Sequence, residues 1–140
     1  MQWRKMNQAM IDRGDMPVGM MVSGNVKDPK VAAAYDAPFP DPSYKAGPLI
    51  MPQRVPVTPD DPANEANKKA WEVCSSWEKP FLTAFSDGDP VTKDGEQTFL
   101  KRLKGVKNVT IKGGGHFLQE DTPEPLCAEI ISFMQETPSS

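Results

Sequence analysis

The chain has 140 residues, 38% of them apolar and 25% charged, which is typical of one soluble globular domain. The formal net charge of −3 argues against nucleic acid as a partner, because proteins that bind phosphate backbones concentrate Lys and Arg. Fifteen prolines and ten glycines argue against an all-helical bundle and predict long irregular connections.

The first half of the chain contains helical patterns and one proline-rich stretch. Residues 1–13 place large apolar side chains at helical spacing, and Asp28 followed by Pro29 is typical of the start of a short helix that reaches Tyr35. Eight prolines within residues 38–62 predict that regular helix is absent there. Because many apolar side chains accompany these prolines, we expect an ordered excursion packed over another surface.

The second half alternates helices with short strands. Strands are predicted at residues 81–85 and 106–111. Helices are predicted from the cap pair Asp61 and Pro62 to about Glu78, over roughly 95–103, and after Thr122, which would cap the last helix. The apolar face of the helix that ends near Glu78 is formed by Ala66, Ala70, Trp71, Cys74 and Trp77. The apolar face of the helix after Thr122 is formed by Leu126, Ile130, Phe133 and Met134. The order from the first strand onward predicts two parallel strands. Because two parallel strands are not a stable sheet, we expect part of a larger α/β domain.

The thiols and the imidazole are too few for a zinc site or a disulfide framework. Cys74 and Cys127 form no CxxC pair, and His116 is the single histidine, so we expect no metal and no cofactor. Both cysteines fall at apolar helical positions, which predicts small buried hydrophobic side chains. No apolar run has the length of a membrane span, and no signal-peptide pattern opens the chain, so the sequence predicts a cytoplasmic protein with no membrane partner.

Two loops follow the carboxyl ends of the predicted strands, residues 86–92 and 113–121, where open α/β sheets gather catalytic groups. Asp89 lies on the first loop, and His116 follows three glycines on the second, in the order of the acid and histidine of a hydrolase triad. The alternatives are a loop histidine without a catalytic role and a solvated acidic turn formed by Asp87, Asp89 and Asp94. Asp87 is the competing candidate for the triad acid, but it lies closer to the strand and could equally be a turn residue that hydrogen-bonds its own backbone. No Ser or Asp has a glycine both two residues before it and two residues after it. The sequence therefore lacks the Gly-x-Ser-x-Gly or Gly-x-Asp-x-Gly pattern of a nucleophile elbow.

Four stretches carry a resemblance to a known family: AYDAPFPDPSYKAG, VTPDDPA, WEKPFLTAFSDGDPVT and GGGHFLQED. They resemble the cap and C-terminal segments of haloalkane dehalogenases of the α/β-hydrolase superfamily, over nearly the whole chain. The first stretch is specific to that family and its close relatives. The resemblance implies a partial α/β-hydrolase fold, with residues 1–61 as a cap segment and ordered proline-rich excursion, and residues 62–140 as the C-terminal part of the core.

The resemblance also implies roles for individual residues. Asp89 matches the triad acid, His116 matches the catalytic base, and Trp3 matches the cap tryptophan whose indole N–H helps to hold the departing halide. The residues that match the lining of the apolar substrate pocket are Met51, Pro52, Val55, Val91 and Phe117.

The implied reaction cleaves the carbon–halogen bond of a small haloalkane. A carboxylate displaces the halide to form an alkyl-enzyme ester, which a water deprotonated by His116 then hydrolyses. The nucleophile belongs to the family's N-terminal half, so we expect the chain alone to be inactive and that half to be its partner. The alternatives are an epoxide hydrolase that uses Tyr35 and Tyr44 as donors, an esterase of the same fold, or a non-catalytic fragment that binds a partner.

Overall fold

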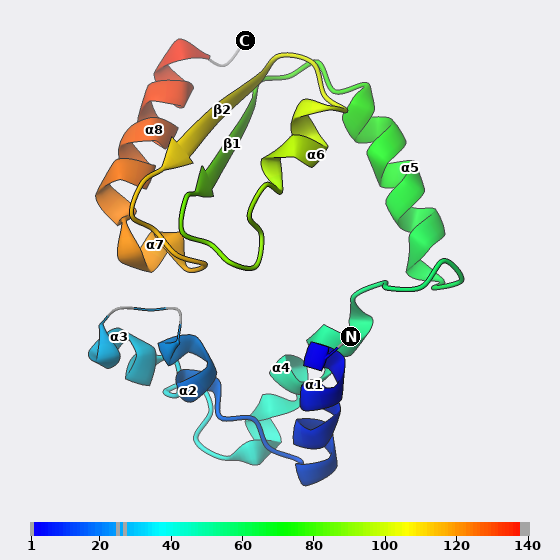
Figure 1. Cartoon of the computed structure of the whole chain (residues 1–140), viewed down its shortest axis with the longest axis vertical. Helices are drawn as coiled ribbons and strands as arrows, with labels where there is room; N and C mark the ends of the chain where they lie inside the picture. The colour runs from blue at the N-terminus through cyan, green and yellow to red at the C-terminus, as the bar shows by residue number, and fades with distance from the viewer. Residues whose placement is uncertain (1, 25, 27, 138–140) are drawn as a thin grey trace. The chain divides into compact units, whose positions relative to one another are not determined.

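The computed structural model describes residues 2–24, 26 and 28–137, except for the side chains of Gln2, Trp3 and Ser23. Backbone contacts divide the chain into two compact units, Met1–Asn64 and Glu65–Ser140. Figure 1 shows that the described elements of the first unit are helical and that the sheet lies in the second unit.

The helices of the first unit are short. They are α1 (Gln2–Arg13), α2 (Val18–Ser23), α3 (Pro29–Ala34), the 3-10 turn η1 (Pro42–Lys45), α4 (Ala46–Ile50) and the 3-10 turn η2 (Met51–Arg54). The predicted first helix is confirmed by α1. The predicted start of α3 is also confirmed, because the Asp28 carboxylate accepts a hydrogen bond from the Lys30 N–H at 2.8 Å and Pro29 occupies the first turn.

The proline-rich stretch does contain regular helix, so that part of the sequence prediction is wrong. Pro42 and Pro52 lie in the first turns of η1 and η2, and Pro48 lies in the first turn of α4. Backbone N–H groups of a first turn have no partner within the helix, so a proline there removes no hydrogen bond. The Asp41 carboxylate supports this geometry by accepting a hydrogen bond from the Ser43 N–H at 2.9 Å.

A polar network joins α1 to the segment formed by α4 and η2. The buried Asn7 donates through Nδ2 to the Leu49 carbonyl at 3.0 Å and accepts from Gln53 Nε2 at 2.7 Å. Arg4 donates through Nη2 to the carbonyls of Gln53 and Val55, at 3.0 and 2.5 Å. These hydrogen bonds hold the ordered proline-rich segment against α1.

The second unit has a two-stranded parallel sheet with helices on both sides. Its elements are α5 (Ala63–Ser75), β1 (Phe81–Ser86), α6 (Glu96–Leu100), β2 (Val106–Ile111), α7 (Leu118–Asp121) and α8 (Pro123–Glu136). The strands pair from Phe81 with Val106 to Ser86 with Ile111. Figure 1 shows α6 and α8 on opposite sides of the sheet. The predicted strand, helix, strand, helix order is therefore confirmed.

An aromatic cluster forms the core between α5, β1 and α6. The Phe99 ring lies 5.5 Å from that of Trp71, 5.6 Å from that of Phe81 and 6.5 Å from that of Phe85, measured between centroids. Leu103 and Ile111 in the same unit are also buried, at 6% and 2% exposure. This cluster anchors the sheet from one side.

Helix α8, on the other side of the sheet, buries less of its apolar face than the sequence pattern predicts. Leu126 and Phe133 are half-buried, whereas Ile130 and Met134 are exposed. Two strands cover only part of a helix of this length, so the rest of the apolar face stays in contact with solvent.

Three further local predictions are corrected. Helix α5 ends at Ser75, before Glu78, and of its apolar face only Trp71 and Cys74 are half-buried, whereas Ala66, Ala70 and Trp77 are exposed. Cys127 is exposed and Cys74 is only half-buried. The Thr122 hydroxyl does not cap α8: it donates to the Leu118 carbonyl at 3.0 Å, because α7 ends immediately before it.

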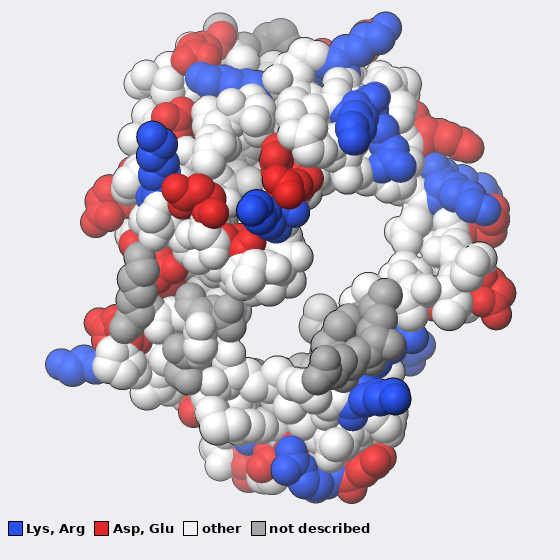
Figure 2. Space-filling view, in the orientation of Figure 1, with Lys and Arg blue, Asp and Glu red and all other residues white. Residues whose placement is uncertain are grey.

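The surface is charged with both signs. Figure 2 shows Lys and Arg side chains interspersed with Asp and Glu over the described surface that faces the viewer. Among the described residues, every helix is too short or too polar to cross a membrane.

Candidate functional site

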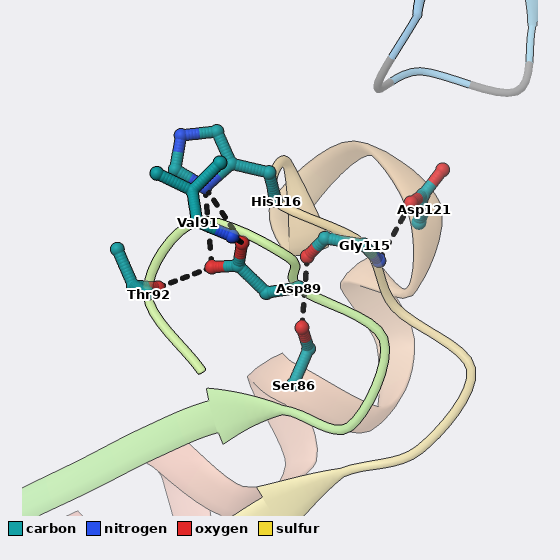
Figure 3. A network of polar contacts seen from close by, with 7 residues as sticks. All are labelled: Ser86, Asp89, Val91, Thr92, Gly115, His116 and Asp121. Carbon is teal, nitrogen blue, oxygen red and sulfur yellow. Dashed lines mark hydrogen bonds and ion pairs between the residues drawn. The ribbon is translucent and has the colours of Figure 1, made fainter. Parts of the chain in front are cut away.

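The two candidate catalytic side chains meet at the carboxyl edge of the sheet. Because β1 and β2 are parallel and end opposite each other, at Ser86 and Ile111, the loops that follow them leave from the same edge. Asp89 lies in the loop after β1, and His116 lies in the loop after β2. The His116 Nδ1 is 3.1 Å from each carboxylate oxygen of Asp89 (Figure 3). The predicted juxtaposition of acid and histidine is therefore present in the structure.

The Asp89 carboxylate is buried and fully hydrogen-bonded, with 5% of the residue exposed. Its Oδ1 accepts from the Val91 N–H at 2.7 Å, and its Oδ2 accepts from the Thr92 hydroxyl. Burial raises the pKa of Asp89, but the hydrogen bonds from Thr92, Val91 and His116 outweigh it and hold that pKa well below its ordinary value. The carboxyl is therefore ionised throughout the physiological pH range.

An ionised carboxylate at Nδ1 determines what the imidazole can do. Nδ1 carries the proton that it shares with Asp89, which leaves the lone pair on Nε2 free to accept a proton. The His116 side chain is 32% exposed, and the ring meets Phe117 edge-on, with centroids 5.3 Å apart. A buried acid that orients a partly exposed histidine is the arrangement of a general base.

The competing acid, Asp87, has a different set of contacts. Its carboxylate accepts from the Gly113 N–H at 2.8 Å, and its own N–H donates to the Ile111 carbonyl at 3.2 Å. Gly113 has a φ of +79°, which favours glycine. Asp87 therefore ties the two loops together at their base, while Asp89 faces the histidine.

The loops also approach each other closely through two glycines. The Gly88 N–H donates to the Gly114 carbonyl at 3.2 Å, and a Cβ on Gly88 would lie only 2.6 Å from that oxygen. Because the obstacle is backbone, a side chain at this position would force the loops apart. The absence of a side chain at Gly88 thus permits the close approach of the loops that carry Asp89 and His116.

Two supporting residues were missed at the level of sequence. The Ser86 hydroxyl donates to the Gly115 carbonyl at 2.8 Å, and the Asp121 carboxylate accepts from the Gly115 N–H at 2.9 Å (Figure 3). The available signals were weak: a hydroxyl that ends a mostly apolar strand, and an acid within a polar loop. Their importance depends on how closely the two loops approach in space.

The predicted substrate-pocket residues lie in both units. Met51, Pro52 and Val55 are in the first unit, and Val91 and Phe117 are in the second. Met51, Val55 and Val91 expose 69%, 47% and 65% of their surface, while Pro52 and Phe117 are half-buried. The side chain of Trp3, the predicted halide-binding residue, lies outside the described residues. Among the described residues, no three His, Cys, Asp or Glu side chains are grouped to hold a metal ion.

No protein-family model matches the chain, but individual known proteins are similar to it. The haloalkane dehalogenase of Psychrobacter cryohalolentis is 47% identical over 125 residues, which are 86% of this chain and 41% of the relative. That of Mycobacterium marinum is 42% identical over 123 residues, or 84% of this chain and 41% of the relative. The chain thus spans about two fifths of the length of the curated relatives that it matches.

A solved structure of a haloalkane dehalogenase is also similar to this chain. The haloalkane dehalogenase DpaA from Paraglaciecola agarilytica NO2, described as tetrameric, superposes with a TM-score of 0.74 at 27% identity. The match covers 97% of this chain and 44% of that one. This chain is therefore a homologue of one part of the haloalkane dehalogenases, with a partial α/β-hydrolase fold.

Proposed function

We propose that this chain supplies the acid–base half of a haloalkane dehalogenase active site. The observation that carries the proposal is the contact of His116 Nδ1 with both oxygens of Asp89 at the carboxyl edge of the sheet. Homology over most of the chain selects the reaction, because the same pair serves many hydrolases. His116 is the proposed catalytic base, and Asp89 is the acid that orients it.

The proposed reaction has two steps. In the first, a carboxylate attacks the halogen-bearing carbon, the carbon–halogen bond breaks, and the halide leaves with the electron pair. In the second step, His116 Nε2 takes a proton from a water molecule while the oxygen of that water attacks the ester carbonyl carbon. The ester C–O bond then breaks, which releases an alcohol and restores the carboxylate. Asp89 stabilises the imidazolium until it gives its proton to the departing alkoxide, and the proton left on the carboxyl group is released to solvent.

The attacking carboxylate is assigned to the part of the enzyme that this chain does not match. No Ser or Asp of the chain has glycine at both second flanking positions, and the chain spans about two fifths of its relatives. We therefore propose that the partner of this chain is the remaining part of the enzyme, and that the 140 residues alone do not turn over haloalkanes.

The proposal extends to the substrate and its surroundings. The substrates are a small haloalkane and water, with Trp3 as a halide donor and Met51, Pro52, Val55, Val91 and Phe117 as the apolar pocket. The support is chemical: a donor-only indole N–H suits a halide, and an apolar wall excludes bulk water. We place the reaction in the cytoplasm because both cysteines are free.

The direct test is a completed enzyme, in which this chain replaces the matching region of the Psychrobacter relative. We expect repeated turnover of bromobutane, with bromide and butanol released in equal amounts. A folded completed enzyme that releases no bromide would contradict the proposal, and the unmodified relative is the positive control.

The esterase alternative is separated from the dehalogenase by the DNA upstream of the first codon. An in-frame Gly-x-Asp-x-Gly sequence supports the dehalogenase, whereas Gly-x-Ser-x-Gly indicates an esterase, because the elbow residue is the nucleophile in each case.

A further inference from the structure

The histidine loop reaches His116 through three consecutive glycines, Gly113 to Gly115. Glycine loses more conformational freedom on folding than any other residue, so this backbone needs outside contacts to present the imidazole in one direction. Gly113 and Gly114 are held near the base of the loop by Asp87 and Gly88. Gly115, the residue next to His116, is held differently.

Both polar groups of Gly115 are bound by side chains. The buried Ser86 donates to its carbonyl at 2.8 Å, and Asp121 Oδ2 accepts from its N–H at 2.9 Å. The first bond fixes the peptide that joins Gly115 to His116, and the second fixes the peptide before it (Figure 3). A hydrogen bond to a carboxylate is stronger than one between neutral groups, so the Asp121 contact is the firmer of the two.

Only one of the two carboxylate oxygens of Asp121 has a hydrogen-bond partner among the described residues. Its Oδ1 is buried and has no hydrogen-bond partner among the described residues. An unsatisfied buried acceptor reduces stability, so stability alone does not account for an aspartate here. The one described hydrogen bond of this carboxylate is directed at the peptide next to the histidine.

We propose that Asp121 and Ser86 are positioning residues that hold His116 in the orientation that directs Nδ1 at Asp89. The effect of these two residues on catalysis rests on the proposed function, whereas their effect on the orientation of His116 does not. With the preceding peptides fixed, Nδ1 lies 3.1 Å from each oxygen of Asp89, and Nε2 is left to meet water. Without them, the glycine run samples other directions, and the imidazole loses its single tautomer.

The geometry is tested by NMR in the completed enzyme, because two parallel strands alone are not a stable sheet, and the histidine signal that disappears in His116→Ala identifies His116. In a sample labelled with ¹⁵N-histidine, at a pH where the ring is neutral, we expect the Nδ1–H tautomer to dominate. Asp121→Ala should give a mixture with the Nε2–H tautomer, whereas Asp121→Asn should restore the parent spectrum because its amide oxygen still accepts from the Gly115 N–H. Gln119→Ala, on the exposed face of the same short helix, is the matched control.

An unchanged tautomer in Asp121→Ala would overturn the proposal, as would a parent chain without the dominant Nδ1–H signal. Backbone amide signals of β1 and β2 report separately whether the variant has unfolded. If the sheet signals disappear in Asp121→Ala, Ser86→Ala takes its place, with the same expected loss of the single tautomer and the same refuting result.

The catalytic meaning is tested in the completed enzyme by separating the two reaction steps. We expect Asp121→Ala to leave the first burst of halide unchanged and to slow ester hydrolysis by about 10- to 100-fold, the effect of a misplaced base. An equal loss of both steps indicates a merely structural role and would overturn the proposal. Failure of the completed enzyme itself refutes the proposed function and leaves the NMR result to decide the positioning role.

Discussion

Replacement of Asp89 by asparagine should separate the two steps of the proposed reaction. In the parent, Oδ1 and Oδ2 accept from Val91 and Thr92, and both face His116 Nδ1. An asparagine keeps the size of the side chain but removes its charge and places an N–H donor on one side. The amide NH₂ then replaces one of the two acceptors at Nδ1. A donor at this place favours the tautomer that carries its proton on Nε2, and that proton blocks Nε2 as a base.

The expected magnitude follows from the ion pair that forms in the second step. The imidazolium and the carboxylate have charge centres about 4 Å apart, and at an effective dielectric constant of about 20 they attract by about 4 kcal/mol. That energy corresponds to about 10³-fold in rate. Because the halide leaves before His116 acts, ester hydrolysis should slow by this factor while the first burst of halide is preserved.

The assay is halide release by the completed enzyme, resolved in time. Asp89→Asn should show a burst equal to the enzyme present, followed by steady turnover about 10³-fold slower than the parent. Asp87→Asn is the matched control, because its amide oxygen still accepts from the Gly113 N–H, and it should stay close to the parent rate. Steady turnover of Asp89→Asn within tenfold of the parent would refute the assigned role of Asp89.

Two further predictions concern stability. Hydrogen bonds lower the pKa of Asp89 in the folded chain, so the ionised carboxylate adds stability that is complete above about pH 4 and is lost as the pH falls toward the lowered value. When unfolding is followed by circular dichroism, the free energy of unfolding of Asp89→Asn should therefore fall less in acid than that of the parent. The same dependence on pH in both proteins would argue against a buried ionised carboxylate. Gly88→Ala should lower the free energy of unfolding by about 1–3 kcal/mol, because its Cβ meets the Gly114 carbonyl, whereas Gly47→Ala has open space and is the control. A Gly88→Ala variant as stable and as active as the parent would contradict the close approach of the loops.

The sheet and the proximity of Asp89 to His116 were predictable because local signals agree with the fold. Pro80 and the Ser86 to Pro90 turn residues bound one mostly apolar run, and the glycine run after Ile111 bounds the other. Parallel strands then place both following loops at one edge, which is enough to expect Asp89 near His116.

The helices of the proline-rich stretch were not predictable from proline content. A proline ends a helix in its interior but is tolerated in its first turn, and the sequence alone does not reveal which case applies. Pro42, Pro48 and Pro52 all occupy first turns. The position of each helix start, set by residues such as Asp41, decides the outcome.

The supporting residues of the site depend on contacts distant in sequence. Ser86 reaches Gly115 across 29 residues, so its role follows from strand pairing and not from spacing. The exposure of Ile130 and Met134 on the apolar face of α8 could not be foreseen either, because helical periodicity reveals an apolar face but not how much of it the sheet covers.

The assignment of His116 as the base of the second step is tested most directly by trapping the ester. His116→Ala in the completed enzyme should form the alkyl-enzyme with bromobutane and fail to hydrolyse it. Mass spectrometry of the intact protein should then show the added butyl group, with a single equivalent of bromide released. Continued turnover at the parent rate, with no butyl adduct, would contradict the account.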